Sequence, residues 1–478
     1  MSLLNKKTSL IREKRLQAIS AYYGSTELLL NENIKEGQFL QRVRTFSQET
    51  ASDILYALNV VSTIPESAIV IHGAAGCGAG RLSLDLIDNN DGKWAVTNLN
   101  ERDSIMGSDV KLREAIKQVY KLHHPKIVFV ISTPIVAINN DDIETVVEEL
   151  TDELGISIVP VYSDGFRSKI GTTGYDIVSH SIAKYILKRD STIKNEAPKA
   201  NYVNLLSVSE NEADLQEVNR LLQELGLNTN VFPRYADLEN IQNVKNASFS
   251  ISINPDEADY PGKIFETDFQ IPYIQSVLPL GIAHTSQWIT DISIATGHKT
   301  EALELISREK EKLTELLKKR KFNKQKVFIS LTPAYAIAVY DLLVELGFEV
   351  VGIKLSYIDQ LHFGFVEKLK TERPDLALLV GEGQLFEEEN LIQKVNPEIY
   401  IGGKGGDFAV PIRNGIPVIN IDSIQIIGFN GVINFVEKIG RSLANTSFTQ
   451  LLAQNETRTY TNGWINKSTN WFIKKEVK

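Results

Sequence analysis

The sequence predicts an α/β protein with three doubly wound parallel-sheet domains around a central cleft, preceded by a helical N-terminal arm. Short runs that are apolar at every position, rather than at every second one, alternate with segments of helical spacing. Glycine commonly ends a helical segment just before the next apolar run. The alternation restarts near residues 197 and 322, which indicates three α/β units.

The arm and the first domain occupy residues 1–45 and 46–197. The arm is predicted to be helical because residues 11–23 mix charged and apolar side chains at helical spacing. In the first domain, strands are predicted at 68–71, 126–132 and 156–162, and helices at 81–87, 111–122 and 141–154. Strands that are apolar throughout indicate a parallel sheet covered by helices on both faces.

The second and third domains are predicted at residues 198–322 and 323–478, the latter with a C-terminal helical tail. The second has strands at 201–208 and 230–232 around a helix at 210–225. The third has a helix at 334–346 and strands at 326–331, 349–353, 377–380, 399–401 and 418–421. Ligands of such sheets bind beyond the carboxyl ends of the strands, so we expect the site in a cleft where loops of neighbouring domains meet.

Composition narrows the class of partner. The chain has 478 residues and a formal net charge of −9, an acidic balance that argues against nucleic acid as a main partner. Its longest apolar runs, such as 127–131, are far below the ~20 residues of a membrane helix. The basic N-terminus lacks the apolar core of a signal peptide. We therefore expect a cytoplasmic protein that binds neither membrane nor nucleic acid.

The most restrictive count is that of cysteine, because Cys77 is the only one. A single cysteine cannot form an internal disulfide. It cannot hold an iron–sulfur cluster alone either, since such clusters usually need about four thiolates. Cluster chemistry would have to be shared with another chain.

Cys77 lies in a glycine-rich stretch, residues 72–80, between a predicted strand and a predicted helix. The stretch is not a P-loop, because it has no lysine, and it lacks the third glycine of the dinucleotide-binding fingerprint. A thiolate near a helix start favours metal ligation or reactivity. The residues alone favour a small buried thiol at a turn, and a packed, hydrogen-bonded role for His72.

Three further segments have two interpretations each. Asp141 and Asp142 could bind a cation or move protons, but capping of the following helix is favoured. The loop around Lys404 could cradle an anion, although a tight strand-to-helix crossover is somewhat favoured. The tail with Trp464 and Trp471 is expected to pack against the body or a partner chain.

Taken together, the motifs resemble a known family, the component 1 proteins of nitrogenase and their relatives in cofactor assembly and tetrapyrrole reduction. His72-Gly73-Ala-Ala-Gly76-Cys77 is similar to the family's His-Gly-x-x-Gly-Cys loop. Further matches follow in order at Thr97–Ile116, at Ser132-Thr133-Pro134 with Asp141-Asp142-Ile143, at Gly165–Asp176, at Leu278–Gly297 and at Gly428-Phe429-Asn430-Gly431. The matches span residues 46–445, nearly the whole globular body.

The resemblance implies three Rossmann-like domains per subunit, an assembly of two related chains, and an ATP-hydrolysing iron–sulfur reductase that docks and donates electrons. It also implies a cluster between the two chains, held by cysteines from both. Carried over residue by residue, it gives Cys77 as the metal ligand and His72, Gly73, Gly76 and Thr133 as cofactor-binding residues. The other two cysteine positions of β-type chains fall at Pro134 and near Ser47, so the set of cluster ligands is reduced.

Two functions are therefore predicted. In the first, the chain is a β-like, oligomeric subunit that supports ATP-dependent low-potential reduction or metallocofactor assembly with an α-like partner. The family's active-site cofactor belongs to α-type chains through a cysteine and a histidine, and residues 255–269 and 418–422 contain neither. In the second, the chain is a cluster-free protein that binds a small or tetrapyrrole-like molecule on the same fold.

Overall fold

The computed structural model describes residues 2–7, 18–31, 52–80, 93–165, 168, 170–189, 199–318, 322, 324–403, 408–455 and 463. The chain divides into two compact units. The first contains residues 1–11, 51–208 and 226–275, and the second contains residues 12–50, 209–225 and 276–478. The predicted helix at 81–87, most of the join near residue 197, the Lys404 loop and most of the C-terminal tail lie outside the described residues.

A four-stranded sheet begins the first unit. Its strands, all parallel, lie in the order β3 (Trp94–Val96), β2 (Ser67–His72), β4 (Ile127–Ser132) and β5 (Ser157–Val161). The two inner strands, β2 and β4, are buried along their whole length, as their unbroken apolar pattern predicts.

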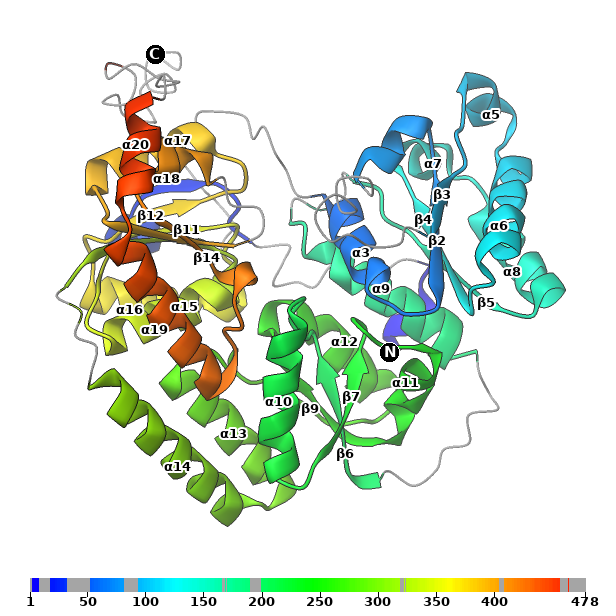
Figure 1. Ribbon diagram of the computed structural model, residues 1–478. Coiled ribbons are helices and arrows are strands. Elements are labelled where there is room, and N and C mark those ends of the chain that lie inside the picture. The colour runs from blue at the N-terminus through cyan, green and yellow to red at the C-terminus, as the bar shows by residue number, and fades with distance from the viewer. Residues whose placement is uncertain are drawn as a thin grey trace. The chain divides into compact units, whose positions relative to one another are not determined.

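Helices cover both faces of this sheet, which confirms its doubly wound character. Figure 1 shows α3 (Asp53–Ser62) and α9 (Thr173–Ile182) on one face and α6 (Asp109–His123) and α8 (Ile143–Leu154) on the other. Each pair encloses its own hydrophobic core against the strands. Both faces of the sheet are therefore covered by helices, and polar loops lie at the carboxyl ends of its strands.

The second sheet belongs to the same unit and is also parallel. Its order is β7 (Asn228–Phe232), β6 (Lys199–Leu206), β8 (Ala247–Ser252) and β9 (Tyr273–Ile274). It carries α11 (Leu238–Asn243), η5 (Val244–Asn246) and α12 (Pro255–Asp268). Helices α9 and α12 pack together, so the first two sheets share one hydrophobic core.

The second unit is built on a six-stranded sheet. Its order is β1 (Tyr22–Ser25), β12 (Ala377–Val380), β11 (Glu349–Leu355), β10 (Lys326–Leu331), β13 (Ile399–Gly402) and β14 (Val418–Asn420). In Figure 1, α17 (Leu385–Val395) and α18 (Ala409–Arg413) lie above the sheet, and α15 (Pro333–Glu345) lies below it with α16 (Phe363–Glu372). All strands but β1 are parallel, which confirms a third Rossmann-like sheet.

The N-terminal arm departs from the helical prediction. Residues Tyr22–Ser25 form β1, which pairs antiparallel with β12 at the edge of the six-stranded sheet. Only η1 (Leu3–Asn5) and α2 (Thr26–Asn31) are helical in the described part of residues 1–45. The prediction is wrong at β1 because an open sheet edge stabilises a strand whatever its helical spacing, and buried Tyr22 fits that edge.

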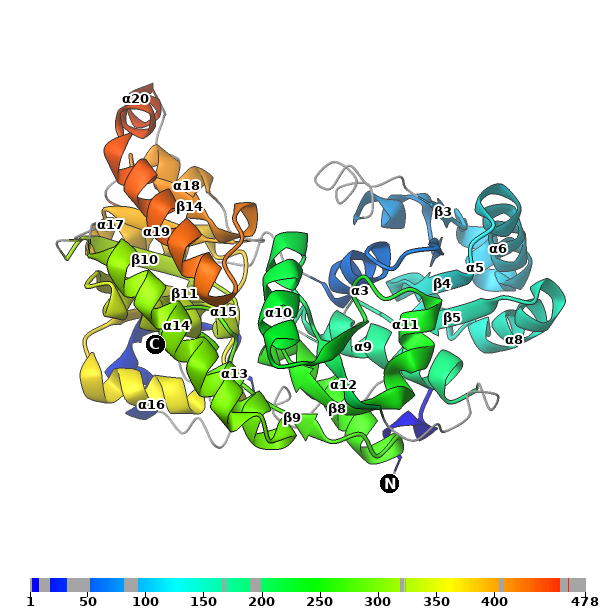
Figure 2. The same cartoon turned by 60° about the horizontal axis from the view of Figure 1, so that its bottom comes forward.

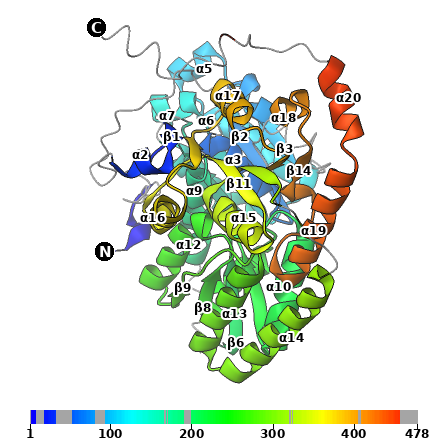
Figure 3. The ribbon, with the colours of Figure 1, turned by 90° about the vertical axis from the view of Figure 1, so that its left-hand side faces the viewer.

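Helices from distant parts of the sequence complete the second unit. Figure 2 shows α13 (Ile282–Thr296), α14 (Lys299–Leu317) and α19 (Gly428–Ala444) side by side, and α10 (Glu212–Glu224) also packs on α19. Figure 3 shows α20 (Ser447–Asn455) beyond the end of α19. The sequence places α13 and α14 in the second domain, whereas they lie in the compact unit of the third sheet.

Two acidic side chains of α10 hold the start of α19. Asp214 Oδ1 accepts hydrogen bonds from the amides of Ile426 and Ile427, at 2.7 and 2.9 Å. Gly428 has φ +76°, and a Cβ there would lie 2.5 Å from Cγ of Glu217. The glycine that opens the motif at 428–431 is therefore required by backbone conformation and by close packing.

Minor elements connect these parts, namely η3 (Ala75–Gly78), α5 (Glu101–Met106), α7 (Pro134–Asn139), η4 (Ala183–Leu187), η6 (Gln360–His362) and η7 (Ile421–Ser423). Among the helices that the structure describes, none is long and apolar enough to cross a membrane.

Candidate functional site

The predicted site residues meet at the carboxyl edge of the first sheet. Strand β2 ends at His72 and leads into Gly73, β3 leads into Thr97, and β4 leads into Thr133. These three strands are parallel neighbours, so their carboxyl ends lie at the same edge. All five predicted site residues (His72, Gly73, Gly76, Cys77 and Thr133) belong to the same compact unit.

The loop that carries Cys77 is tight on its inner side and open on its outer side. It turns through the short 3₁₀ helix η3, in which the amide of Cys77 donates to the carbonyl of Ala74 at 2.9 Å. A Cβ on Gly78 would lie 2.8 Å from the side chain of Val96, so this glycine allows η3 to pack against β3. Gly76 is exposed, and a Cβ there would meet nothing within 4 Å.

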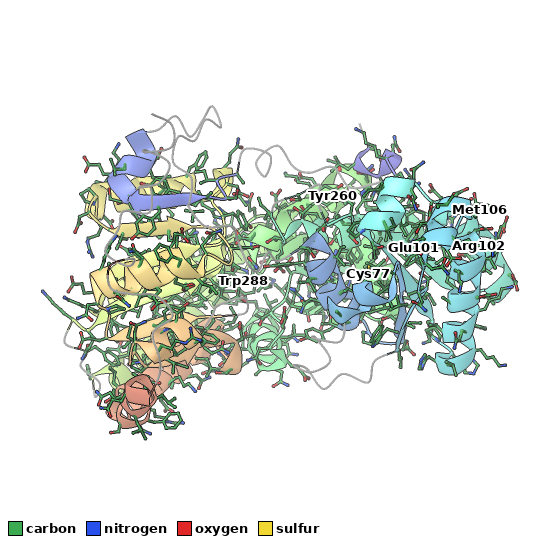
Figure 4. The ribbon with its side chains drawn as sticks, turned by 90° about the horizontal axis from the view of Figure 1, so that it is seen from above. Cys77, Glu101, Arg102, Met106, Tyr260 and Trp288 are labelled. Atoms are coloured by element: carbon green, nitrogen blue, oxygen red, sulfur yellow. The ribbon has the colours of Figure 1, made fainter. Side chains whose placement is uncertain are left out.

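The thiol of Cys77 lies beside the hydroxyl of Thr133. A Cβ built on Gly73 would lie 2.4 Å from Thr133 Oγ1 and 3.1 Å from Cys77 Sγ, so the two atoms are at most about 5.5 Å apart, the sum of these distances. Cys77 is partly exposed, whereas Thr133 is buried. Figure 4 shows Cys77 in the first unit, together with Glu101, Arg102 and Met106 of α5. Cys77 also packs against the hydrophobic core of the first unit, and any residue with a side chain at position 73 would clash with Thr133.

His72 is fully buried behind this loop. Its Nδ1 lies 3.1 Å from Thr97 Oγ1, and its Nε2 lies 3.0 Å from Ser108 Oγ. Burial lowers the pKa of His72 to about 4, against the opposing effect of the Asp141 carboxylate, so the ring is neutral at pH 7. Both ring nitrogens already have partners within the chain, which confirms the packed, hydrogen-bonded role.

Asp141 and Asp142 have separate tasks. The carboxylate of Asp142 accepts from the amide of Thr145 at 3.2 Å and caps α8, as predicted. Asp141 instead accepts a hydrogen bond from Ser108 Oγ, and its carboxylate lies 3.8 Å from His72 Nε2. The capping prediction is therefore confirmed for Asp142 and wrong for Asp141, because a buried histidine and serine offer it polar partners.

An exposed apolar patch lies on α5, α6 and α7 of the same unit. It consists of Ile105, Met106, Val110 and Ile138, which are 81%, 76%, 61% and 70% exposed. The side-chain amide of Asn139 donates to the carbonyl of Ser104 at 2.9 Å and joins α7 to α5. Figure 4 shows Met106 at the outer edge of the unit. Exposed apolar residues on neighbouring elements are the side chains that docking surfaces use, and the sequence analysis missed this group.

The donor atoms of this site are few. In the part of the chain that the structure describes, no group of three or more His, Cys, Asp or Glu residues could hold a metal ion. Thr133 Oγ1 donates to the carbonyl of His72 at 2.7 Å, and Pro134 has no side-chain donor. An iron–sulfur cluster usually needs about four thiolates, so this chain fits as the source of one ligand and not as the sole holder of a cluster.

Comparison with known proteins identifies the family. The sequence profile of nitrogenase component 1 type oxidoreductases matches residues 52–444. The chain belongs to this family. The match covers every described strand except β1, together with the Cys77 loop, and it confirms the resemblance drawn from the ordered motifs.

Relatives in the family match most of the chain. The chain is 26% identical to the nitrogenase molybdenum-iron protein alpha chain of Methanothermobacter thermautotrophicus, over 80% of this chain and 85% of that one. It is 25% identical to the nitrogenase iron-molybdenum cofactor biosynthesis protein NifE of Clostridium pasteurianum, over 80% and 84%. A solved structure, nitrogenase Cp1 at pH 6.5, matches with a TM-score of 0.72 at 18% identity, over 88% of this chain and 97% of that one. That likeness confirms the fold.

Proposed function

We propose that this chain is a β-like subunit of a nitrogenase component 1-type complex, which supports ATP-dependent low-potential reduction or metallocofactor assembly with an α-like chain. In this proposal, Cys77 supplies one thiolate to an iron–sulfur cluster that the partner holds with its own cysteines. The observation that carries it is the place of Cys77, a partly exposed residue that packs against the core of the first unit and lies next to Gly76, where a Cβ would meet nothing within 4 Å.

The cysteine count supports the β-like role. One thiol cannot serve both a cluster shared between subunits and the active-site cofactor that α-type chains hold. The N-terminus of α12, where the resemblance would place an α-type cysteine, carries Asn254, Pro255 and Asp256 instead. Relatives named for the molybdenum-iron protein and for cofactor biosynthesis are consistent with either reduction or assembly.

What the residues of this chain do at the site is limited and specific. Gly73 leaves room for the thiol and the Thr133 hydroxyl to lie side by side. Thr133 donates to the carbonyl of His72 and fixes the end of β2. A thiolate is the ligand that iron–sulfur clusters require, and that is the chemistry Cys77 would contribute. Gly76, which has no side chain, leaves the approach to the loop unobstructed.

The apolar patch supports a docking partner for the same function. A reductase that delivers electrons needs a surface on the unit that holds the cluster ligand, and the patch lies on the unit of Cys77. A few residues near the centre of an interface carry most of the binding energy, and replacing one of them lowers the affinity more than tenfold. We propose that Ile105, Met106 and Ile138 contact the ATP-hydrolysing iron–sulfur reductase.

Anaerobic co-expression with a component 1-type partner from the same genome tests the proposal. We expect the two chains to copurify with bound iron and an electron paramagnetic resonance signal after reduction. If they do not associate, or associate without iron, the proposal fails. In that case the cluster-free alternative gains weight, and binding of a tetrapyrrole to the isolated chain would support it.

A charge substitution in the patch tests the docking surface. Met106→Glu is expected to lower the rate of ATP-dependent electron transfer from the reductase about tenfold or more, because a charge would be buried at the interface. Leu122→Glu is the matched control, since Leu122 is also an exposed apolar residue, 64% exposed, but lies at the far end of α6. Equal rates for the two variants would contradict this surface.

A further inference from the structure

A continuous chain of hydrogen bonds runs behind the Cys77 loop. The amide of Gly73 donates to Thr97 Oγ1 at 2.9 Å, Thr97 Oγ1 lies 3.1 Å from His72 Nδ1, and His72 Nε2 lies 3.0 Å from Ser108 Oγ. Ser108 Oγ in turn donates to the carboxylate of Asp141. Thr97, His72 and Ser108 are all at most 5% exposed, so water does not replace these bonds.

Counting the protons shows which group donates and which accepts at each step of this chain of hydrogen bonds. Ser108 has a single hydroxyl proton and gives it to the Asp141 carboxylate, so its oxygen must accept from His72 Nε2–H. A neutral imidazole has only one N–H, and Nδ1 therefore accepts from the hydroxyl of Thr97. If Thr97 donated to the Gly73 carbonyl at 3.2 Å instead, Nδ1 would be a buried acceptor without a donor.

The order of these groups excludes a hydrolytic role. In a serine nucleophile system the histidine lies between the serine and the carboxylate and removes the serine proton. Here the serine lies between the histidine and Asp141, and its proton is already committed to the carboxylate. The chain of hydrogen bonds can therefore fix positions, but it cannot activate Ser108.

The loop needs such an external constraint. Residues 73–80 contain four glycines, which give the backbone more conformational freedom than any other residue type. The peptide between His72 and Gly73 is held on both sides, by Thr133 at its carbonyl and by Thr97 at its amide. A Cβ at Gly73 would lie 3.1 Å from Cys77 Sγ, so this peptide directly adjoins the thiol.

We propose that Ser108 and Asp141 are positioning residues for the Cys77 thiol. They hold His72 as the Nε2–H tautomer, and through Thr97 they fix the backbone of Gly73 and thus the direction of the thiol. That this direction serves a shared cluster rests on the proposed function. The positioning itself does not, because it is a property of the isolated chain.

The single cysteine makes the test clean, since iodoacetamide alkylates only one thiol in the chain. The rate of Cys77 alkylation is measured at constant pH in the full-length native protein. Ser108→Ala removes the link between His72 and Asp141, and we expect the rate to rise about tenfold as the loop loosens. Ser108→Thr keeps a hydroxyl and is expected to react at nearly the wild-type rate.

Asp142→Asn is the matched control for Asp141, because it changes a neighbouring carboxylate that caps α8 without touching His72. Asp141→Ala should raise the alkylation rate as Ser108→Ala does, and Asp142→Asn should leave it within about twofold. A merely structural role for Ser108 would lower the melting temperature but leave the native thiol rate unchanged, and that result would overturn the proposal. An equal rise in Asp142→Asn would overturn it as well.

The outcome does not depend on cluster binding. Should Ser108→Ala fail to fold, Asp141→Ala with its Asp142→Asn control gives the same decision. Iron in the copurified pair is measured separately. If the variants alkylate faster but the copurified pair keeps its iron, the link between thiol positioning and the cluster is contradicted. If the thiol is positioned as proposed but the pair contains no iron, only the proposed function is contradicted.

Discussion

Acid is expected to destabilise the first unit through two buried histidines, His72 and His180. Burial lowers the pKa of each from 6.5 to about 4. His180 Nδ1 lies 3.1 Å from the hydroxyl of Tyr260, and its Nε2 lies 3.2 Å from the carbonyl of Lys6. The unfolded chain takes up a proton at each histidine below pH 6.5, whereas the folded chain does so only near pH 4. Stability is therefore full above pH 6.5 and is lost as the pH falls through this window.

The size of the effect follows from these pKa values. The gap between 6.5 and about 4 corresponds to about 3 kcal/mol per histidine when complete, and to about 2 kcal/mol at pH 5. Urea unfolding at pH 7, 6 and 5, followed by circular dichroism, measures the change. His180→Gln removes one titrating ring, and it should reduce the loss between pH 7 and 5 by about 2 kcal/mol.

His123→Gln is the control, because His123 lies at the end of α6 and outside the hydrophobic cores. Its loss of stability between pH 7 and 5 is the reference against which His180→Gln is compared. Two results would refute the reasoning. One is a wild-type stability that is the same at pH 7 and pH 5, and the other is a His180→Gln variant with the wild-type slope.

Two further changes test the packing by urea unfolding. Gly73→Ala should lower the free energy of unfolding by about 1–3 kcal/mol, because its Cβ would meet Thr133. If the double variant Gly73→Ala/Thr133→Ala recovers none of this free energy, a clash with Thr133 is not the cause. Lys354→Met should lower the free energy of unfolding by about 3–5 kcal/mol, because it removes the charge partner of the buried Glu388 carboxylate, which also accepts from the Tyr400 hydroxyl at 2.6 Å. Lys354→Met/Glu388→Gln should recover most of this loss, and an unchanged loss would be evidence against a buried charge as its cause.

The parallel sheets could be predicted from the sequence because their signal is local. Strands such as β2 and β4 are apolar at every position, and that pattern occurs where both faces of a strand are buried. The loop that carries Cys77 could be found for the same reason, since its glycines and its thiol are adjacent in the chain. Edge strand β1 could not be found, because its pairing with β12 joins residues far apart in the sequence.

The hydrogen bonds that join His72, Ser108 and Asp141 behind the site could not be predicted from the sequence. Ser108 lies 36 residues from His72 and 33 from Asp141, and the three meet only when β2, α6 and the loop before α8 fold together. Nothing around Ser108 in the sequence marks it, except that it follows Gly107 at the start of α6. The sequence predicts a cap at Asp141 because an acidic residue before a helix usually acts as one, but its neighbour Asp142 caps α8 instead.

Iron retention by the Cys77→Ala chain, copurified anaerobically with its component 1-type partner, is the most direct measurement of the central claim. Ala79→Ser is the control, since it alters an exposed residue of the same loop without removing the thiol. The account predicts that Cys77→Ala loses iron and the reduced paramagnetic signal, while Ala79→Ser keeps both. A Cys77→Ala pair that assembles and retains the wild-type iron content would contradict the claim that this thiol is a cluster ligand.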